Sequence, residues 1–135
     1  MQAIEDITRL EGDFQAMREL YPDVFTAVPH ITWNNRLTNC AGRCWTHPRQ
    51  GHHCSKIELS TKFLCTNGYD ILLETLLHEC AHAIVNKRHN ASMQHRTEFR
   101  AVCDEIGCKN KACTYDYAAP AARLTAAVKN YIRRY

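Results

Sequence analysis

The feature that most constrains this chain is a pair of histidines, four residues apart, inside its strongest helical pattern. Apolar residues recur with a helical period over residues 70–87, and Asp70 is the expected N-cap. Within this run, His78-Glu79-Cys80-Ala81-His82 fits the motif HExxH. The spacing puts both imidazoles on one face of the helix, one turn apart, where they can share a metal ion. Glu79 lies beside them, where its carboxylate can reach a metal-bound water without binding the metal.

A third ligand must come from outside the motif, because a catalytic zinc ion usually has three protein ligands and one open position for water. His89 follows His82 by seven residues, and a continuing helix carries it away from the metal. His95 follows His82 by 13 residues, which leaves room for a loop and a return. The chain also has four more distant candidates: His30, His47, His52 and His53.

The remaining patterns predict an α+β fold in a single domain covering residues 1–135. An amphipathic helix is expected over residues 3–20, ended by Pro22. Short segments rich in β-branched and aromatic residues follow, and they predict a small antiparallel sheet with strands at 31–37, 40–45 and 55–59. After the motif helix, further helices are expected over 95–106, closed by Gly107, and from Pro120 to the C-terminus.

Composition and cysteine use indicate an intracellular protein. Hydrophobic residues make up 45% of the chain, but no apolar run approaches the roughly 20 residues needed to cross a bilayer. The first ten residues include Glu5 and Asp6 where a secretory signal has positive charge and then an apolar run. The eight cysteines are therefore expected as thiols or metal ligands, and no membrane partner is expected.

Several ordered segments around the motif resemble the SprT-like zinc metalloprotease family, which includes Spartan, a protease that degrades proteins crosslinked to DNA. The family pattern is HExxHA followed by a third histidine in a segment HGxEF or HGxxF, and residues 95–99 read HRTEF. Residues 33–37 (WNNRL) and 40–44 (CAGRC) resemble its short sheet, and 73–77 (LETLL) resembles the run entering its zinc helix. The similarity covers about residues 30–106.

The resemblance implies a zincin-like fold and one zinc ion per chain, held by His78, His82 and His95, with Glu79 as the general base. Arg96 stands where the family usually has glycine, and Thr97 stands where many members have proline. A further donor should stabilise the oxyanion of the reaction. The tyrosines considered for it are Tyr69, Tyr115 and Tyr117.

The other cysteines offer an alternative metal site. Cys40, Cys44 and Cys54 lie near three histidines and could form a structural zinc site. The resemblance instead places similar cysteines on paired strands without a metal, and we favour that interpretation. Cys103 and Cys108 belong to a five-residue series without a CxxC pair, so no zinc ribbon is expected.

Charge is distributed unevenly along the chain. Residues 1–30 hold two arginines and six acidic residues, a net charge of −4, so the rest of the chain carries +7. Such a basic body suits an anionic partner such as nucleic acid, although a solvated helix face gives the same pattern. Arginines interleaved with aromatic residues can bind unpaired bases. The candidate DNA contacts are Trp33, Arg36, Arg43 and Trp45, with Arg123, Lys129, Arg133 and Arg134 in the basic segment 117–135.

The sequence thus predicts a monomeric zinc endopeptidase that degrades DNA-bound or DNA-crosslinked proteins and is stimulated by DNA, single-stranded or with unpaired bases. The expected location is the nucleus of a eukaryote, or the cytoplasm or nucleoid if the source is bacterial or viral. Two alternatives stay open at this point. One is a DNA-binding or scaffold protein with a structural zinc ion, and the other is a general zinc peptidase without a nucleic-acid role.

Overall fold

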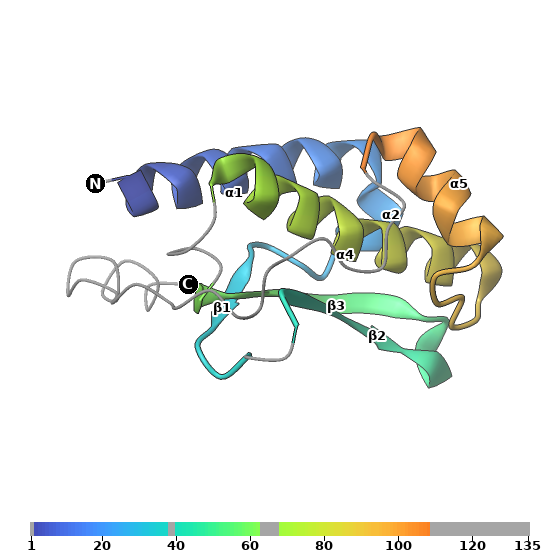
Figure 1. Cartoon of the computed structure of the whole chain (residues 1–135). Coiled ribbons are helices and arrows are strands. Elements are labelled where there is room, and N and C mark those ends of the chain that lie inside the picture. Colours follow the sequence, from blue (N-terminus) through green and yellow to red (C-terminus); the bar gives the residue numbers. More distant parts are fainter. Residues whose placement is uncertain (1, 38–39, 63–67, 109–135) are drawn as a thin grey trace.

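The computed structural model describes residues 2–37, 40–62 and 68–108, and it shows an α+β fold (Figure 1). One face of a small sheet is covered by helix α4, and α1 packs against α4 in turn. The elements, in chain order, are α1 (Gln2–Leu20), α2 (Pro22–Phe25), β1 (Thr32–Asn34), β2 (Gly42–His47), a 3-10 turn (Pro48–Gln50), β3 (His53–Ser60), α4 (Tyr69–His89) and α5 (Thr97–Ile106).

The sheet is mixed, so the prediction of an antiparallel sheet is wrong for β1. The strand order is β1-β3-β2, in which β2 is antiparallel and β1 parallel to the central β3. β3 takes the central place because its last four residues are buried on both faces. The chain between β1 and β2 is tied to the end of β3, since Ser60 donates hydrogen bonds to the carbonyls of Leu37 and Ala41. β2 thereby reaches the far edge of β3 instead of pairing with β1.

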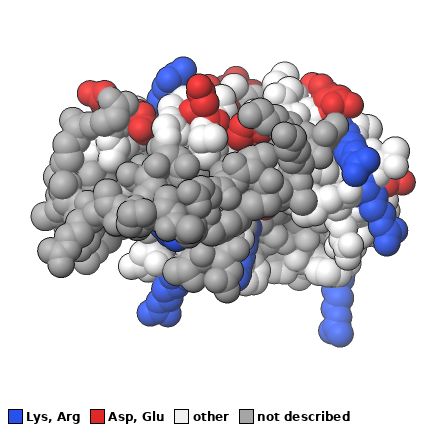
Figure 2. All heavy atoms as spheres, viewed as in Figure 1, with Lys and Arg blue, Asp and Glu red and all other residues white. Residues whose placement is uncertain are grey.

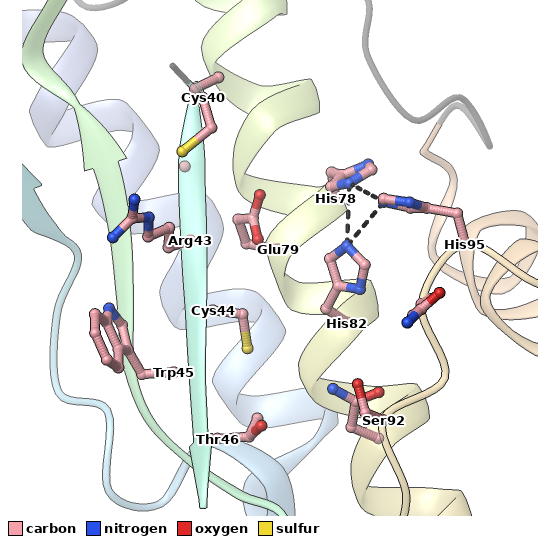
Figure 3. A pocket seen from close by; sticks show the side chains of 14 residues that line it. Cys40, Arg43, Cys44, Trp45, Thr46, His78, Glu79, His82, Ser92 and His95 are labelled. Carbon is pink, nitrogen blue, oxygen red and sulfur yellow. Dashed lines mark hydrogen bonds between the residues drawn. The ribbon is translucent and has the colours of Figure 1, made fainter. Parts of the chain in front are cut away.

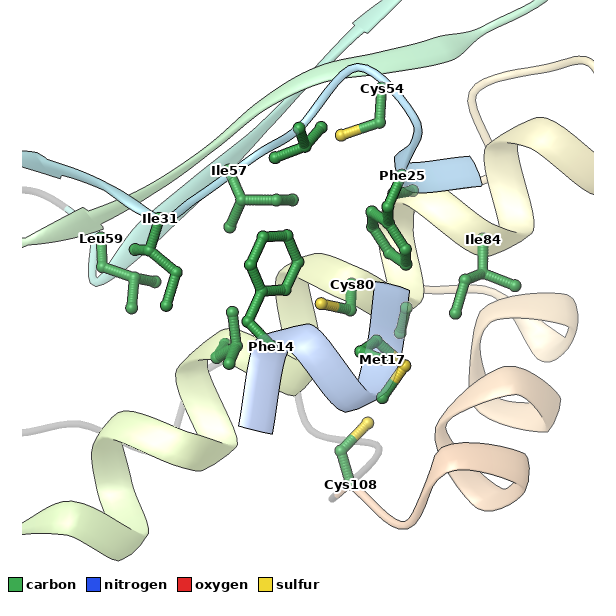
Figure 4. Close-up of a cluster of buried hydrophobic side chains, with 14 of the residues drawn as sticks. Phe14, Met17, Phe25, Ile31, Cys54, Ile57, Leu59, Cys80, Ile84 and Cys108 are labelled. Atoms are coloured by element: carbon green, nitrogen blue, oxygen red, sulfur yellow. The ribbon is translucent and has the colours of Figure 1, made fainter. Parts of the chain in front are cut away.

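Side chains from α1, α2, the sheet and α4 form one hydrophobic core (Figure 4). Phe14 from α1 meets Phe25 from α2 edge to face, with ring centroids 5.6 Å apart. Ile57 of β3 and Cys80 of α4 are fully buried in the same cluster. Cys80 therefore points into the core, away from the face of α4 that carries the two histidines.

The ends of α4 and α5 correct two details of the sequence prediction. Gly68, not Asp70, is the N-cap of α4. Asp70 lies in the first turn, where the positive end of the helix dipole stabilises its negative charge. α5 begins at Thr97, two residues later than expected. Its end is confirmed, because Gly107 adopts a left-handed φ of 83° and its N–H bonds the carbonyl of Cys103.

Two further sequence predictions concern the chain ends and the membrane. The helix predicted from Pro120, within the basic segment 117–135, lies outside the described residues. Within residues 2–37, 40–62 and 68–108, no helix is both long enough and apolar enough to cross a bilayer.

The core makes a quantitative prediction for α1. Phe14→Ala is expected to lower the free energy of unfolding by about 3–5 kcal/mol, because it leaves a cavity opposite Phe25 and the sheet. The measurement is urea denaturation followed by circular dichroism. Leu20→Ala, at the end of the same helix, is the control, since Leu20 is 71% exposed and should change stability by only about 0.5 kcal/mol. Equal losses in the two variants would contradict the packing described.

Candidate metal centre

Two of the three histidines of the site come from the middle of α4. His78 and His82 are one turn apart, and their rings meet edge to face with centroids 4.8 Å apart. The opposite face of the helix, including Cys80 and Ile84, is fully buried. Burial of that face fixes the rotation of α4 about its own axis, and so it directs both imidazoles to the same side.

The third histidine comes from the loop after α4. The helix ends at His89, and its C-cap, Asn90, adopts a left-handed φ of 48°. The chain then turns back, and Gln94, also at φ 48°, precedes His95. Arg96 is extended, so the side chain in place of the family's glycine causes no backbone strain. The start of α5 at Thr97 leaves His95 outside the helix and free to face α4.

The three imidazoles converge on one point (Figure 3). The Nε2 atom of His95 lies 3.1 Å from that of His78 and 3.1 Å from that of His82, and the latter two are 3.2 Å apart. A tetrahedral zinc ion with Zn–N bonds of about 2.0–2.1 Å holds its nitrogen ligands roughly 3.3–3.4 Å from one another. The spacing and the chemistry of the three donors therefore fit zinc.

The two histidines of α4 are also in the protonation state that binds a metal. Burial lowers the pKa of His82 to about 3, with a further contribution from the two neighbouring imidazoles. Burial lowers the pKa of His78 to about 4, and His95 adds to this shift. Both imidazoles are thus neutral at pH 7 and offer a lone pair.

Phe99 packs against the rings of all three histidines. Its side chain is fully buried, and its ring centroid lies 5.0, 4.5 and 5.0 Å from those of His78, His82 and His95. An aromatic surface in contact with all three rings limits their rotation. Phe99 was expected only as the last residue of the segment that resembles the family pattern, and its position four residues after His95, at the start of a helix, is a signal for the contact.

Glu79 lies between the histidines and the sheet (Figure 3). It is 7% exposed, and burial raises the pKa of its carboxyl to about 8. Strand β2 approaches it closely at Gly42, where an added Cβ would lie 3.1 Å from Cγ of Glu79 and 2.8 Å from the carbonyl oxygen of Glu58. A side chain at position 42 would therefore displace either the strand or Glu79.

The histidines and Glu79 open into a cleft of about 650 Å³ between β2 and α4. Figure 3 shows Cys44 and Thr46 on the side of β2 that faces α4, with Arg43 and Trp45 on the other side. The cleft is lined by residues 40–46, by Glu79, Asn86 and the two histidines of α4, and by Ser92, Gln94 and His95 of the loop.

The other candidate ligands lie elsewhere. His89 is exposed at the end of α4, and the rings of His47 and His53 stack on each other across β2 and β3. The Sγ atoms of Cys44 and Cys54 are 3.9 Å apart. Within the described part of the chain, the trio of His78, His82 and His95 is the only group of three or more ligand side chains close enough to hold one ion.

The structure gives the positions of some of the residues expected as oxyanion donors or DNA contacts. The hydroxyl of Tyr69 donates to Asp13, and its position nine residues before His78 puts it about 14 Å away along the helix. Trp33 is 9% exposed and belongs to the core, whereas Trp45 is 44% exposed. Arg36 and Arg43 are exposed. The remaining candidates lie outside the described residues: Tyr115, Tyr117, Arg123, Lys129, Arg133 and Arg134.

Comparison with known proteins identifies a family that this chain matches. The SprT-like family model matches residues 10–120, which is most of the chain. The chain belongs to the SprT-like family. This family is of the zinc metalloprotease type, so membership suggests a metallopeptidase. The resemblance drawn from the motif and the short sheet is thereby confirmed.

A curated relative matches a shorter stretch of this SprT-like chain. The germ cell nuclear acidic protein of Drosophila melanogaster is 45% identical to it over 53 residues, which are 39% of this chain and 5% of the relative. The chain therefore spans about a twentieth of that protein's length. No solved structure matches the chain.

The convergence of three imidazoles predicts one zinc ion per chain, measured by elemental analysis of the purified protein. His95→Ala should weaken zinc binding by more than the roughly 10–100-fold that loss of an outer-shell partner costs, because it removes a ligand. His89→Ala is the matched control, because His89 is exposed at the end of α4 and should leave affinity unchanged. Chelator competition measures both. Equal affinity in the two variants would move the third ligand away from His95.

Proposed function

We propose that the protein is a zinc-dependent endopeptidase that cleaves proteins bound or crosslinked to DNA. The observation that carries the proposal is the convergence of three Nε2 atoms, 3.1–3.2 Å apart, beside the buried carboxyl of Glu79 in an open cleft. A structural zinc site needs its ligands alone and has no use for a carboxyl group in this position. The arrangement therefore favours catalysis in a zincin-like site.

The protein's own groups have separate tasks in the proposed reaction. Zinc, when held by His78, His82 and His95, supplies Lewis-acid polarisation of the scissile carbonyl and lowers the pKa of a water molecule. The raised pKa of the Glu79 carboxyl would be lowered by the charge of a zinc ion bound nearby, so that Glu79 would accept the proton of the attacking water and pass it to the departing amine. The contact of Phe99 with the histidine rings and the close approach of Gly42 to Glu79 keep the histidines and the carboxyl group in their relative positions.

Strand β2 offers a way to bind a peptide in extended form. It is the outer strand of the described sheet, because β3 pairs with one of its edges only. The cleft lies along this strand, with the histidines and Glu79 opposite. An extended substrate segment can add to the edge of β2 through main-chain hydrogen bonds, which bind many sequences alike. An open groove of this kind favours internal cleavage of a protein chain.

The exposed face of the hairpin supports a nucleic-acid partner. Trp45 donates its indole N–H to the buried carboxylate of Glu58, and the Lys56 ammonium lies 5.0 Å from the centre of its ring. This contact orients an exposed indole beside two cations, Lys56 and Arg43. Bases stack on such aromatic rings while cations contact phosphates, without sequence preference.

The charge distribution in Figure 2 agrees with this placement. Acidic side chains lie mainly along the upper margin, where a basic side chain also stands, and further basic side chains lie along the right side and project from the lower margin, on the side of the sheet. We also propose a nuclear location and action as a monomer, and the name of the Drosophila relative, a nuclear protein, supports the location.

Glu79→Gln tests the proposed mechanism. The variant should keep one zinc ion per chain, because all three ligands remain, and it should lose about 10²–10⁴-fold in kcat, because the amide cannot carry the proton. The assay follows cleavage of a DNA-binding protein with and without DNA. Zinc binding together with wild-type cleavage would contradict Glu79 as the base. Zinc binding with no cleavage in the wild type would favour a structural zinc site.

Trp45→Ala tests the DNA proposal. Single-stranded DNA should bind about five- to hundredfold more weakly, because a stacking platform is lost, while Trp45→Phe should keep most of the affinity.

Binding and DNA-stimulated cleavage should both fall steeply with salt. Replacing Arg123, Lys129, Arg133 and Arg134 by alanine should flatten that dependence. Fluorescence anisotropy measures binding, and Leu20→Ala on α1 is the surface control. Cleavage indifferent to DNA and to all these changes would favour a general peptidase.

A further inference from the structure

The loop that brings His95 to the other two histidines is hydrogen-bonded to a side chain of α4, that of Asn86. We propose that Asn86 is a positioning residue whose side-chain carbonyl fixes this loop, residues 90–96, in the conformation that completes the metal site. The proposal rests on the zinc-binding function proposed above, and it adds a residue that neither the motif nor the family match assigns.

Asn86 occupies the next turn of the metal-binding face. It follows His82 by four residues, as His82 follows His78, so the three side chains lie in one row along α4. Asn86 is nevertheless 8% exposed, and it lines the cleft with His82 and His95. A buried amide at the end of a helix needs hydrogen-bond partners, and here the loop provides them.

Both carbonyl groups of Asn86 bind the loop. The side-chain Oδ1 accepts a hydrogen bond from the backbone N–H of Met93, at 3.0 Å. The backbone carbonyl accepts one from the N–H of Ala91, at 3.2 Å. The Met93 side chain also packs against the core. The loop is therefore held two residues before His95, close enough to set the direction in which His95 leaves it.

The loop needs such an attachment because its backbone is unusual. Asn90 and Gln94 both adopt φ near 48°, in the left-handed region, which asparagine enters readily at the end of a helix and glutamine enters rarely. The bond to Met93 lies between these two positions. Without an acceptor for the N–H of Met93, the loop has other conformations of similar energy, in which His95 does not face α4. Zinc would then bind only the fraction of molecules with the loop in place, and its apparent affinity would fall by that fraction.

The experiment compares substitutions that remove or keep the acceptor. Asn86→Leu has a similar volume and no acceptor, and Asn86→Ala removes the same acceptor with a smaller side chain. Asn86→Asp keeps an oxygen in the same place. Ser92→Ala is the matched control, because Ser92 is exposed in the same loop and lines the same cleft. Zinc dissociation constants come from chelator competition, and hydrogen exchange reports the protection of the Met93 amide in zinc-free protein.

The proposal expects Asn86→Leu and Asn86→Ala to raise the zinc dissociation constant about 10–100-fold and to remove the protection of the Met93 amide. Asn86→Asp should stay within about threefold of wild type, since a carboxylate oxygen also accepts the bond. The Ser92→Ala variant should have the zinc dissociation constant and the Met93 amide protection of the wild type. Saturating zinc should restore cleavage in the leucine variant, because the substitution acts on the metal site and not on the substrate.

Three results would overturn the proposal. Wild-type zinc affinity in both the leucine and the alanine variants would show that the attachment does not matter. Equal weakening in the aspartate variant would show that the acceptor is not the cause. A wild-type protein that binds no zinc would contradict the proposed function itself, and the role of Asn86 with it, whereas the first two results leave the zinc site standing.

Discussion

The structure depends on one arrangement, the meeting of three imidazoles where helix α4 faces the loop that follows it. Their Nε2 atoms lie 3.1–3.2 Å apart, close to the separation of nitrogen ligands around one tetrahedral zinc ion. Three surrounding features position the histidines. The core fixes the rotation of α4, Phe99 lies beneath the rings, and the loop returns His95 to the helix.

A second constraint joins the sheet to the metal site. Gly42 lets β2 approach α4 so closely that Glu79 is buried between the strand and the histidines. The same strand turns Arg43 and Trp45 to the opposite side, where they are exposed. One short strand thus lines the cleft with one set of side chains and presents basic and aromatic side chains with the other. In the proposed function, this geometry places bound DNA and the protein to be cut on two sides of β2.

The sequence predicted what local spacing determines and missed what distant contacts determine. His78, Glu79 and His82 follow from a helical period, and the turn at Gly107 follows from a glycine after a helix. The parallel pairing of β1 could not be read from local patterns, because it depends on which strand takes the centre of the sheet. Nor could the burial of Trp33, since that depends on register. Asn86 looked like an ordinary helix residue, because its partner Met93 belongs to a loop without periodicity.

The most direct test of the account is the zinc K-edge X-ray absorption spectrum of protein loaded with one equivalent of zinc. The account predicts a first shell of three imidazole nitrogens and one oxygen at about 2.0–2.1 Å, with the outer-shell scattering of imidazole rings. A first shell containing sulfur at about 2.3 Å would contradict it, because the metal would then lie at the cysteines and not at the three histidines beside Glu79.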